Sequence, residues 1–125
     1  AGEVEVDECA VIGGGSLIHQ FCHIGAYVMI QGGALINKDI PPYIKAAREP
    51  IAYAGINIVG LRRRGFSTDE IREIQDVYHL LFMSGMNNSD ALKTIREVVP
   101  ESKIRDRIID FVRASDRGIL RSYNG

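Results

Sequence analysis

Aliphatic residues recur at every sixth position over the first third of the chain. The series has six consecutive members, Val6, Ile12, Ile18, Ile24, Ile30 and Ile36. A period of six matches neither the 3.6-residue period of a helix nor the two-residue alternation of a hairpin strand. It is typical of a solenoid of short parallel strands, in which the chain turns a corner once per hexad and each aliphatic side chain points inward. The alternative is a chance apolar alternation in an ordinary β-sandwich.

Three such hexads close one coil, so residues 6–41 predict about two coils with rungs about 4.8 Å apart. Gly13, Gly25 and Gly33 fall at the turns, where we expect backbone angles that a Cβ would disfavour. Two coils bury few contacts, and solenoids usually need at least three repeats with caps. We therefore expect that Ala1 is a truncation point or that a neighbouring chain covers the open end.

The pattern divides the chain into three parts. Pro41 and Pro42 end the hexads, because neither residue donates to a strand ladder, so residues 1–42 are predicted as the solenoid. Residues 43–66 are predicted as a connecting excursion that packs on the flank of the solenoid. Residues 67–125 are predicted as a C-terminal domain of three short amphipathic helices, which makes the fold class β-solenoid plus α.

Capping signals mark the starts of the three helices. Ser67 and Glu70 form a capping box, in which each side chain bonds the backbone N–H of the other. The second helix is expected to be capped by Asn88 or Ser89, and the third to begin with Glu101 and Ser102. The tail that follows the third helix is expected to be irregular surface chain.

The composition is that of an ordinary globular domain. Of the 125 residues, 46% are hydrophobic and 25% are charged, which excludes collagen, disorder and a membrane span. The start of the chain lacks the order of a secretory signal, so a cytoplasmic location is predicted. Cys9 and Cys22 lack C-x-x-C spacing and are interpreted as buried hydrophobic residues rather than as a disulfide or a metal site.

Acidic and basic residues are distributed unevenly. Residues 1–43 carry five acidic residues and one lysine, whereas residues 44–125 carry 14 Lys and Arg against 11 Asp and Glu. A partner that carries phosphate is therefore expected to touch the second part. The basic excess is too small, and too little interleaved with aromatic residues, to predict binding of nucleic acid.

Two groups of residues are candidates for chemistry. His19 and His23 lie four residues apart on successive strands, and three interpretations stay open: a general base for a sugar hydroxyl or amine, a pair of zinc ligands, or hydrogen-bonded scaffold histidines. Arg62, Arg63 and Arg64 directly precede a predicted helix start. Their guanidinium groups can donate hydrogen bonds to a diphosphate there. The alternative interpretation of the three arginines is a solvated basic patch.

Four short motifs indicate one protein family more specifically than the hexads do. They are Ile18-His19-Gln20-Phe21-Cys22, Ile24-Gly25-Ala26, Asp39-Ile40-Pro41-Pro42-Tyr43 and Gly60-Leu61-Arg62-Arg63-Arg64-Gly65-Phe66-Ser67. Together they resemble the C-terminal half of the UDP-N-acetylglucosamine O-acyltransferase family, hexapeptide-repeat enzymes of the first step of lipid A biosynthesis. The resemblance implies a left-handed parallel β-helix followed by a helical domain, assembled as a homotrimer with active sites between subunits.

The resemblance also implies a reaction. Such an enzyme transfers a 3-hydroxyacyl group from acyl carrier protein to the 3-hydroxyl of UDP-N-acetylglucosamine, and needs no cofactor beyond the phosphopantetheine of the carrier. A histidine is the general base in this family, and its position falls upstream of Ala1. No catalytic residue and no metal ligand are therefore assigned here, and this stretch of chain alone is expected to be inactive.

Substrate-binding positions carry over residue by residue. His19 and Gln20 match groove residues that contact the substrates, and Asn57 matches a position that contacts the nucleotide. Arg63 and Arg64 match the basic pair at the nucleotide end of the donor or acceptor.

One further position matches the family motif, and two positions differ from it. Gly32 matches the position at which side-chain size limits acyl length, so a glycine leaves room for a long chain. Glu3 stands where many members have a histidine, and Val59 stands where an acidic residue is common. Because of these two departures, a sugar nucleotide related to UDP-N-acetylglucosamine is an alternative acceptor.

Three other functions are weighed against this one. The first is an N-acyltransferase of the same pathway, which acts on an amino-sugar acceptor. The second is a metal-dependent hexad protein that resembles γ-type carbonic anhydrases and uses His19 or His23 as a zinc ligand. The third is a structural trimerising module without a ligand.

Overall fold

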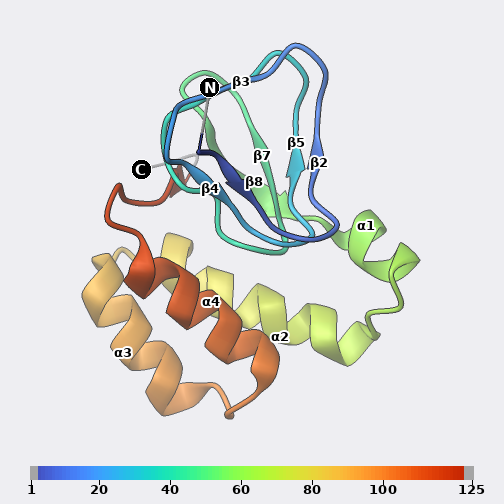
Figure 1. Cartoon of the computed structure of the whole chain (residues 1–125). Helices are drawn as coiled ribbons and strands as arrows, with labels where there is room; N and C mark the ends of the chain where they lie inside the picture. The colour runs from blue at the N-terminus through green and yellow to red at the C-terminus, as the bar shows by residue number, and fades with distance from the viewer. Residues whose placement is uncertain (1–2, 123–125) are drawn as a thin grey trace.

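Six two-residue strands build a three-sided solenoid, one strand per hexad. They are β1 (Glu5–Val6), β2 (Val11–Ile12), β3 (Leu17–Ile18), β4 (His23–Ile24), β5 (Met29–Ile30) and β6 (Leu35–Ile36). In the computed structural model, which describes residues 3–122, each strand of the first coil pairs in parallel with the strand three hexads later (Figure 1). The predicted closure of one coil by three hexads is therefore confirmed.

The second coil carries the core of the solenoid. Ile24, Ile30 and Ile36 are each 2% exposed or less, whereas Val6 in the first coil is 45% exposed. The difference arises because the second coil has chain packed on both sides, while the described residues place a neighbour on only one side of the first coil. The prediction that the aliphatic residue of each hexad points inward is thus confirmed most clearly in the second coil.

Glycines at the corners of the coils have two different structural roles, a positive φ angle at some positions and close contact between coils at others. Positive φ angles recur at every sixth residue: Glu3, Cys9, Gly15, Phe21, Tyr27 and Gly33. Gly33 therefore has the backbone angle expected of it, but for Gly13 and Gly25 that expectation is wrong. A Cβ on Gly13 would lie 2.3 Å from the backbone nitrogen of Gly32, and one on Gly25 would lie 2.5 Å from that of Pro42. These two glycines permit the close approach of one coil to the next.

The parallel ladder extends beyond the paired prolines. Strand β7 (Ile44–Ala47) pairs in parallel with β5, and Met29 lies opposite Lys45. The backbone N–H of Gly25 donates to the carbonyl of Ile40 at 2.7 Å, just before the prolines. The prolines do not end the ladder because residues on either side of them supply its hydrogen bonds, and a partial third coil results.

The segment expected to be a connecting excursion contains regular structure. Strand β8 (Ala52–Ile56) pairs antiparallel with β7, and a short helix, α1 (Ile58–Arg63), follows it. Strand β9 (Arg121–Ser122) then pairs in parallel with β8, and Ile119 forms an isolated bridge with Asp39, so the expectation of an irregular surface tail is wrong for residues 119–122. Leu120, before β9, is only 1% exposed. A two-residue strand has no periodicity that would show in a sequence. The last three residues of the predicted tail lie outside the described part.

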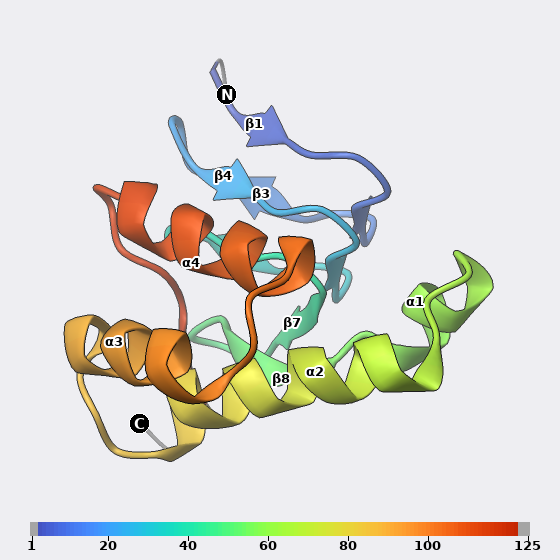
Figure 2. The same ribbon diagram turned by 90° about the horizontal axis from the view of Figure 1, so that it is seen from below.

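Helices cover the base and one side of the solenoid (Figures 1 and 2). They are α2 (Thr68–Tyr78), which continues into a π-helical turn (His79–Met83), α3 (Asn88–Val98) and α4 (Lys103–Ala114). None of the helices among residues 3–122 combines the length and the apolarity that crossing a membrane requires.

The helix starts follow the predicted caps with one correction. The hydroxyl of Ser67 accepts from the N–H of Glu70 at 3.1 Å, and the Glu70 carboxylate accepts from the N–H of Ser67 at 2.8 Å, which confirms the capping box. Ser102 caps α4, as predicted. Asn87, rather than Asn88 or Ser89, caps α3, because its side-chain oxygen accepts from the N–H of Asp90 at 2.8 Å.

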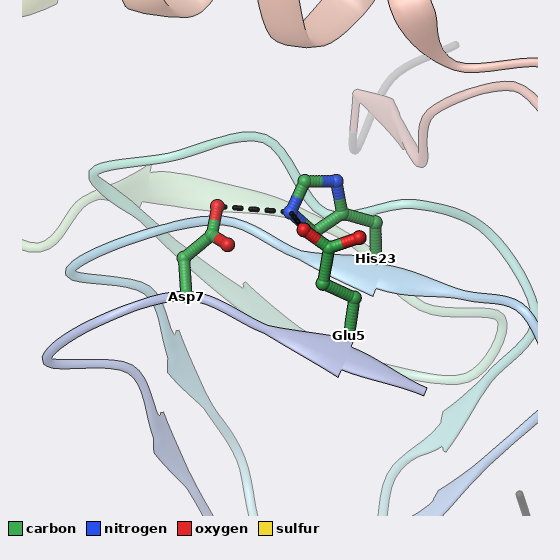
Figure 3. Close-up of side chains that lie close together, drawn as sticks. All are labelled: Glu5, Asp7 and His23. Carbon is green, nitrogen blue, oxygen red and sulfur yellow. Dashed lines mark hydrogen bonds and ion pairs between the residues drawn. The ribbon is translucent and has the colours of Figure 1, made fainter. Parts of the chain in front are cut away.

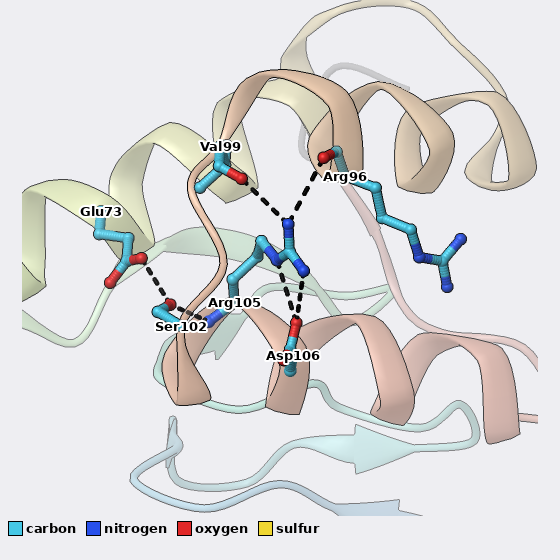
Figure 4. A network of polar contacts seen from close by, with 6 residues as sticks. All are labelled: Glu73, Arg96, Val99, Ser102, Arg105 and Asp106. Atoms are coloured by element: carbon cyan, nitrogen blue, oxygen red, sulfur yellow. Dashed lines mark hydrogen bonds and ion pairs between the residues drawn. The ribbon is translucent and has the colours of Figure 1, made fainter.

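Polar contacts join the three long helices (Figure 4). The Ser102 hydroxyl at the start of α4 donates to the carboxylate of Glu73 on α2 at 2.5 Å. Arg105 donates to the carbonyl of Val99, which follows α3, at 3.0 Å, and it pairs with Asp106 at 2.8 Å. The network fixes the three helices relative to one another.

Helix α4 lies along the face formed by β1 and β4. The ring of Phe111 packs 4.5 Å from the ring of His23, and Arg107 donates to Glu8 at 2.7 Å. The hydrogen bond from Arg107 lowers the pKa of the Glu8 carboxyl. One side of the solenoid is therefore covered by a helix of the same chain.

Tyr78 joins α2 to the solenoid, and its hydroxyl is a testable contact. The Tyr78 hydroxyl donates to the carbonyl of Pro42 at 2.6 Å, and the residue is fully buried. Tyr78→Phe leaves a buried carbonyl without its donor, so we expect a loss of about 1–3 kcal/mol in unfolding free energy, measured by urea denaturation. Tyr53→Phe, whose ring stacks on Tyr78 while its hydroxyl has no bond among the described residues, is the control. Equal losses in both variants would contradict the assigned role of the hydroxyl.

Candidate functional site

Helix α1 places the predicted basic pair at its carboxyl end. Arg63 is the last residue of α1 and Arg64 is its C-cap, and both side chains are exposed. The sequence interpretation associates these arginines with the start of the next helix. The structure shows instead that they belong to a short helix of their own, where positive charge favourably meets the negative end of the helix dipole.

Asn57 ties α1 to the second coil. It is 5% exposed, and its side-chain oxygen accepts from the N–H of Gly60 at 3.3 Å in the first turn of α1. Its side-chain nitrogen donates to the carbonyl of Tyr27 at 3.0 Å, at the corner between β4 and β5. A Cβ on Gly60 would lie 2.4 Å from that nitrogen, so the glycine makes room for the cap. Both amide atoms of Asn57 are thus used to position α1.

These residues converge on a cavity beside the second coil. The cavity has a volume of about 110 Å³ and is lined by Cys9, Val11, Tyr27, Met29, Asn57, Gly60, Arg63 and Arg64. Three of the six predicted binding residues, Asn57 and the two arginines, therefore come together. Tyr27 and Cys9 are lining residues that were not predicted as part of a site, although both stand at corner positions of the hexad pattern.

The other three predicted binding residues lie at different corners of the coil. His19 and Gln20 are exposed at the corner between β3 and β4, and the carbonyl of Gln20 accepts from Arg117 at 2.8 Å. Gly32 is exposed at the corner between β5 and β6. Since the three corners of a coil point in different directions (Figure 1), no single cleft within residues 3–122 of one chain collects all six residues.

The three faces of the solenoid differ in their outward side chains. The β1–β4 face carries polar outward residues beneath α4. On the other two faces the outward residues are apolar and between 40% and 65% exposed: Val11 and Met29 on β2–β5, and Leu17 and Leu35 on β3–β6. Apolar residues that stack in register on an exposed face are typical of an interaction surface.

The two histidines of the sequence analysis are separated. His23 points outward from β4, and its Nε2 atom lies 2.9 Å from the nearer oxygen of Asp7 and 3.4 Å from that of Glu5 (Figure 3). Within residues 3–122, one group of side chains lies close enough together to hold a metal ion, and it consists of Glu5, Asp7 and His23. His19 is not part of this cluster. The geometry therefore does not support a zinc site shared by His19 and His23.

The thiols differ in their surroundings. Cys22 is fully buried, and burial raises its pKa, which confirms its interpretation as a buried hydrophobic residue. Cys9 is only partly buried, because it faces the cavity beside α1.

Comparison with known proteins gives consistent matches. A model described as UDP-N-acetylglucosamine O-acyltransferase, domain 2, matches residues 39–120. The acyl-[acyl-carrier-protein]–UDP-N-acetylglucosamine O-acyltransferase of Alkalilimnicola ehrlichii is 42% identical over 121 residues, which are 97% of this chain and 47% of that protein. The enzyme of the same name from Burkholderia lata is 40% identical over 97% of this chain and 48% of its own length. The chain thus spans about half the length of the curated relatives that it matches.

Solved structures agree with this result. The UDP-N-acetylglucosamine acyltransferase of Bacteroides fragilis superimposes with a TM-score of 0.93 at 55% identity, over 95% of this chain and 47% of that one. The corresponding enzyme of Francisella novicida has a TM-score of 0.92 at 37% identity, over 99% of this chain and 46% of that one. The similarity therefore includes both the solenoid and the helices.

Proposed function

Because the chain belongs to the UDP-N-acetylglucosamine O-acyltransferase family, we propose that it contributes the C-terminal part of an enzyme that transfers a 3-hydroxyacyl group from acyl carrier protein to the 3-hydroxyl of UDP-N-acetylglucosamine. This reaction is the first step of lipid A biosynthesis, and its nucleotide-sugar acceptor favours the predicted cytoplasmic location. The observation that carries the proposal within the chain is the convergence of Asn57, Arg63 and Arg64 on one cavity.

The chemistry of the cavity fits the nucleotide end of such an acceptor. The planar guanidinium groups of Arg63 and Arg64 each offer paired donors that match the oxygens of a diphosphate. Their exposure leaves these donors available to a ligand, while the buried Asn57 holds the helix that presents them. A sugar hydroxyl becomes a nucleophile only when a base removes its proton, and the resemblance places that base outside this stretch of chain.

We propose that the complete site lies between copies of the chain in a homotrimer of left-handed β-helices. The cavity of about 110 Å³ is small beside the 300–1,000 Å³ typical of ligand pockets, so another surface has to complete it. His19, Gln20 and Gly32 stand at corners that only a neighbouring copy can bring near this cavity. The two exposed apolar faces of the solenoid supply surface for that contact.

The test uses the protein expressed from its complete reading frame. Carrier proteins loaded with 3-hydroxyacyl chains of several lengths are offered with UDP-N-acetylglucosamine or with its 3-amino analogue, and the products are identified by mass spectrometry. We expect an O-acylated nucleotide sugar. Acylation of the amino analogue alone would overturn the proposal in favour of an N-acyltransferase, and the absence of any acyl product would overturn the enzyme class.

Gly32→Met is expected to change the preference for acyl length. A Cβ on Gly32 would lie 3.2 Å from the carbonyl oxygen of Gly14, so this backbone neighbour has to move by a few tenths of an ångström for the longer side chain to project from the corner. Each buried methylene contributes about 0.8 kcal/mol, so blocking two or three of them shifts the ratio of kcat/KM for long against short donors by at least about tenfold.

The matched control for this variant is Gly14→Met. Gly14 occupies the same corner one coil earlier, and a Cβ there meets nothing within 4 Å. Competition between two donors of different length, read by mass spectrometry, gives the ratio directly. An unchanged ratio in Gly32→Met would contradict the role assigned to Gly32.

A further inference from the structure

We propose that Glu5, Asp7 and His23 form a binding site for a divalent transition-metal cation, with Zn²⁺ as the best match. The site lies on the β1–β4 face of the solenoid, under α4, and goes beyond the acyltransferase function proposed above. Figure 3 shows the two carboxylates of the first coil pointing toward one edge of the His23 ring on the second coil.

The distances between the donor atoms suit one small cation. A tetrahedral zinc ion with ligands at about 2.0–2.2 Å holds its donor atoms about 3.3 Å apart. The His23 Nε2 atom is 2.9 Å from the Asp7 oxygen and 3.4 Å from the Glu5 oxygen, and the three donor atoms all lie within 4.8 Å of one another. A small rotation of the Glu5 side chain therefore completes a three-ligand set.

The strand pairing of the solenoid fixes this arrangement. Glu5 and Asp7 flank the inward Val6, so both side chains point to the outer surface of the same strand region. Glu5 pairs in register with His23 on the next coil, which stacks the imidazole against the carboxylates. The three ligands thus belong to two adjacent rungs of a rigid scaffold.

His23 is held in place by contacts that leave its Nε2 atom directed at the carboxylates. Its backbone N–H donates to the carboxylate of Asp39 at 2.8 Å, and Asp39 is in turn bonded by the hydroxyl of Ser115 at 2.5 Å. The ring packs against Phe111 of α4 at 4.5 Å. An oriented imidazole favours metal binding, because little conformational freedom is lost when the ion arrives.

The site is reachable and its surroundings carry negative charge. The side chains of Glu5, Asp7 and His23 are 70%, 24% and 32% exposed, so an ion and its water ligands can enter. Glu5 and His23 also line a cavity of about 610 Å³ between the coils and α4, together with Asp39, Asp116 and Arg117.

The basic residues around this cavity have partners of their own. Arg117 donates to the carbonyls of Gln20 and Asn37, at 2.8 and 3.4 Å, and Arg107 pairs with Glu8 at 2.7 Å. Among the described residues, the contact within ion-pair distance that Glu5 and Asp7 make is with the Nε2 atom of His23.

The ligand set selects the class of cation. One imidazole with two carboxylates is the kind of mixed nitrogen and oxygen set that binds Zn²⁺ and its first-row neighbours, and three protein ligands leave a position for water. Mg²⁺ and Ca²⁺ prefer oxygen ligands throughout. A bound cation would link the first coil to the second, so we expect it to stabilise the fold by mass action.

The test again uses the protein from its complete reading frame. After treatment with a chelator, the protein is titrated with zinc sulfate by calorimetry, and thermal unfolding is followed with and without zinc. We expect one zinc ion per chain, a rise in Tm with zinc, and at least a tenfold weaker affinity in Asp7→Asn and in His23→Gln. His79→Gln removes an exposed histidine from the π-helical turn and is expected to bind zinc unchanged.

A third variant keeps the result interpretable. Glu5→Gln changes a side chain that is largely exposed, so it tests the site even if a substitution at His23 disturbs packing against Phe111. The absence of saturable zinc binding below about 1 mM, or equal affinity in the three cluster variants and in His79→Gln, would overturn the proposal. A preference for Mg²⁺ over Zn²⁺ would overturn the assigned class of cation. Acyl transfer by a protein that binds no zinc leaves the proposed function standing.

Discussion

Gly13→Ala is expected to lower the unfolding free energy by about 3 kcal/mol or more, whereas Gly14→Ala changes it by less than about 0.5 kcal/mol. A Cβ on Gly13 would lie 2.3 Å from the backbone nitrogen and 2.5 Å from the Cα of Gly32, and no real Cβ approaches other atoms so closely. The coils cannot separate to relieve the clash without lengthening ladder bonds such as Gly13 N–H to Ile30 C=O, at 2.8 Å.

Gly14 is a close control because it is the next residue in the chain. A Cβ at this position meets nothing within 4 Å, and its φ is outside the left-handed region, so alanine fits without strain. Urea denaturation followed by circular dichroism measures both variants. Equal stability of the two would contradict the close approach of the first and second coils at this corner.

The double variant Arg63→Ala with Arg64→Ala is expected to lower kcat/KM for UDP-N-acetylglucosamine by at least about 100-fold. A hydrogen bond to a charged group contributes about 1.5–3 kcal/mol, and loss of two such bonds exceeds the 2.8 kcal/mol that corresponds to 100-fold. Both side chains are exposed, so the fold is expected to tolerate their removal. Steady-state kinetics with saturating acyl donor and varied acceptor measure the loss.

Two further variants separate geometry from charge. Arg63→Lys with Arg64→Lys keeps two positive charges but loses the planar fork, so an intermediate loss is expected. Arg72→Ala removes an exposed arginine from α2, where its partner Asp69 lies at a distance of 3.9 Å, and is expected to leave kcat/KM unchanged. Retention of kcat/KM within threefold in the alanine double variant would contradict the assignment of the cavity to the nucleotide.

The candidate site was predictable in part. The family motif identified Arg63 and Arg64, and the structure places both on one cavity with Asn57. The bonds that Asn57 makes to Tyr27 and Gly60 carry no signal in the sequence, because Tyr27 lies on a different coil and is brought near by the path of the whole chain. The cluster around His23 also could not be predicted from the sequence, because its carboxylates, Glu5 and Asp7, belong to the preceding coil.

The sequence by itself determined the elements whose causes are local. The hexad period produced the coils, and the capping box at Ser67 and the hydroxyl of Ser102 began α2 and α4, because each signal acts within a few residues of chain. The resemblance carried by four short motifs identified the family that the comparisons show.

Only the tertiary structure decided the features that depend on contacts between distant segments. The ladder continued past Pro42 because β5 offered an edge to β7, and the tail became β9 because β8 offered another. Gly13 proved necessary for the approach of a neighbouring coil rather than for its own backbone angle. Such outcomes follow from which surfaces meet after folding, and a local pattern of residue types does not record which surfaces those are.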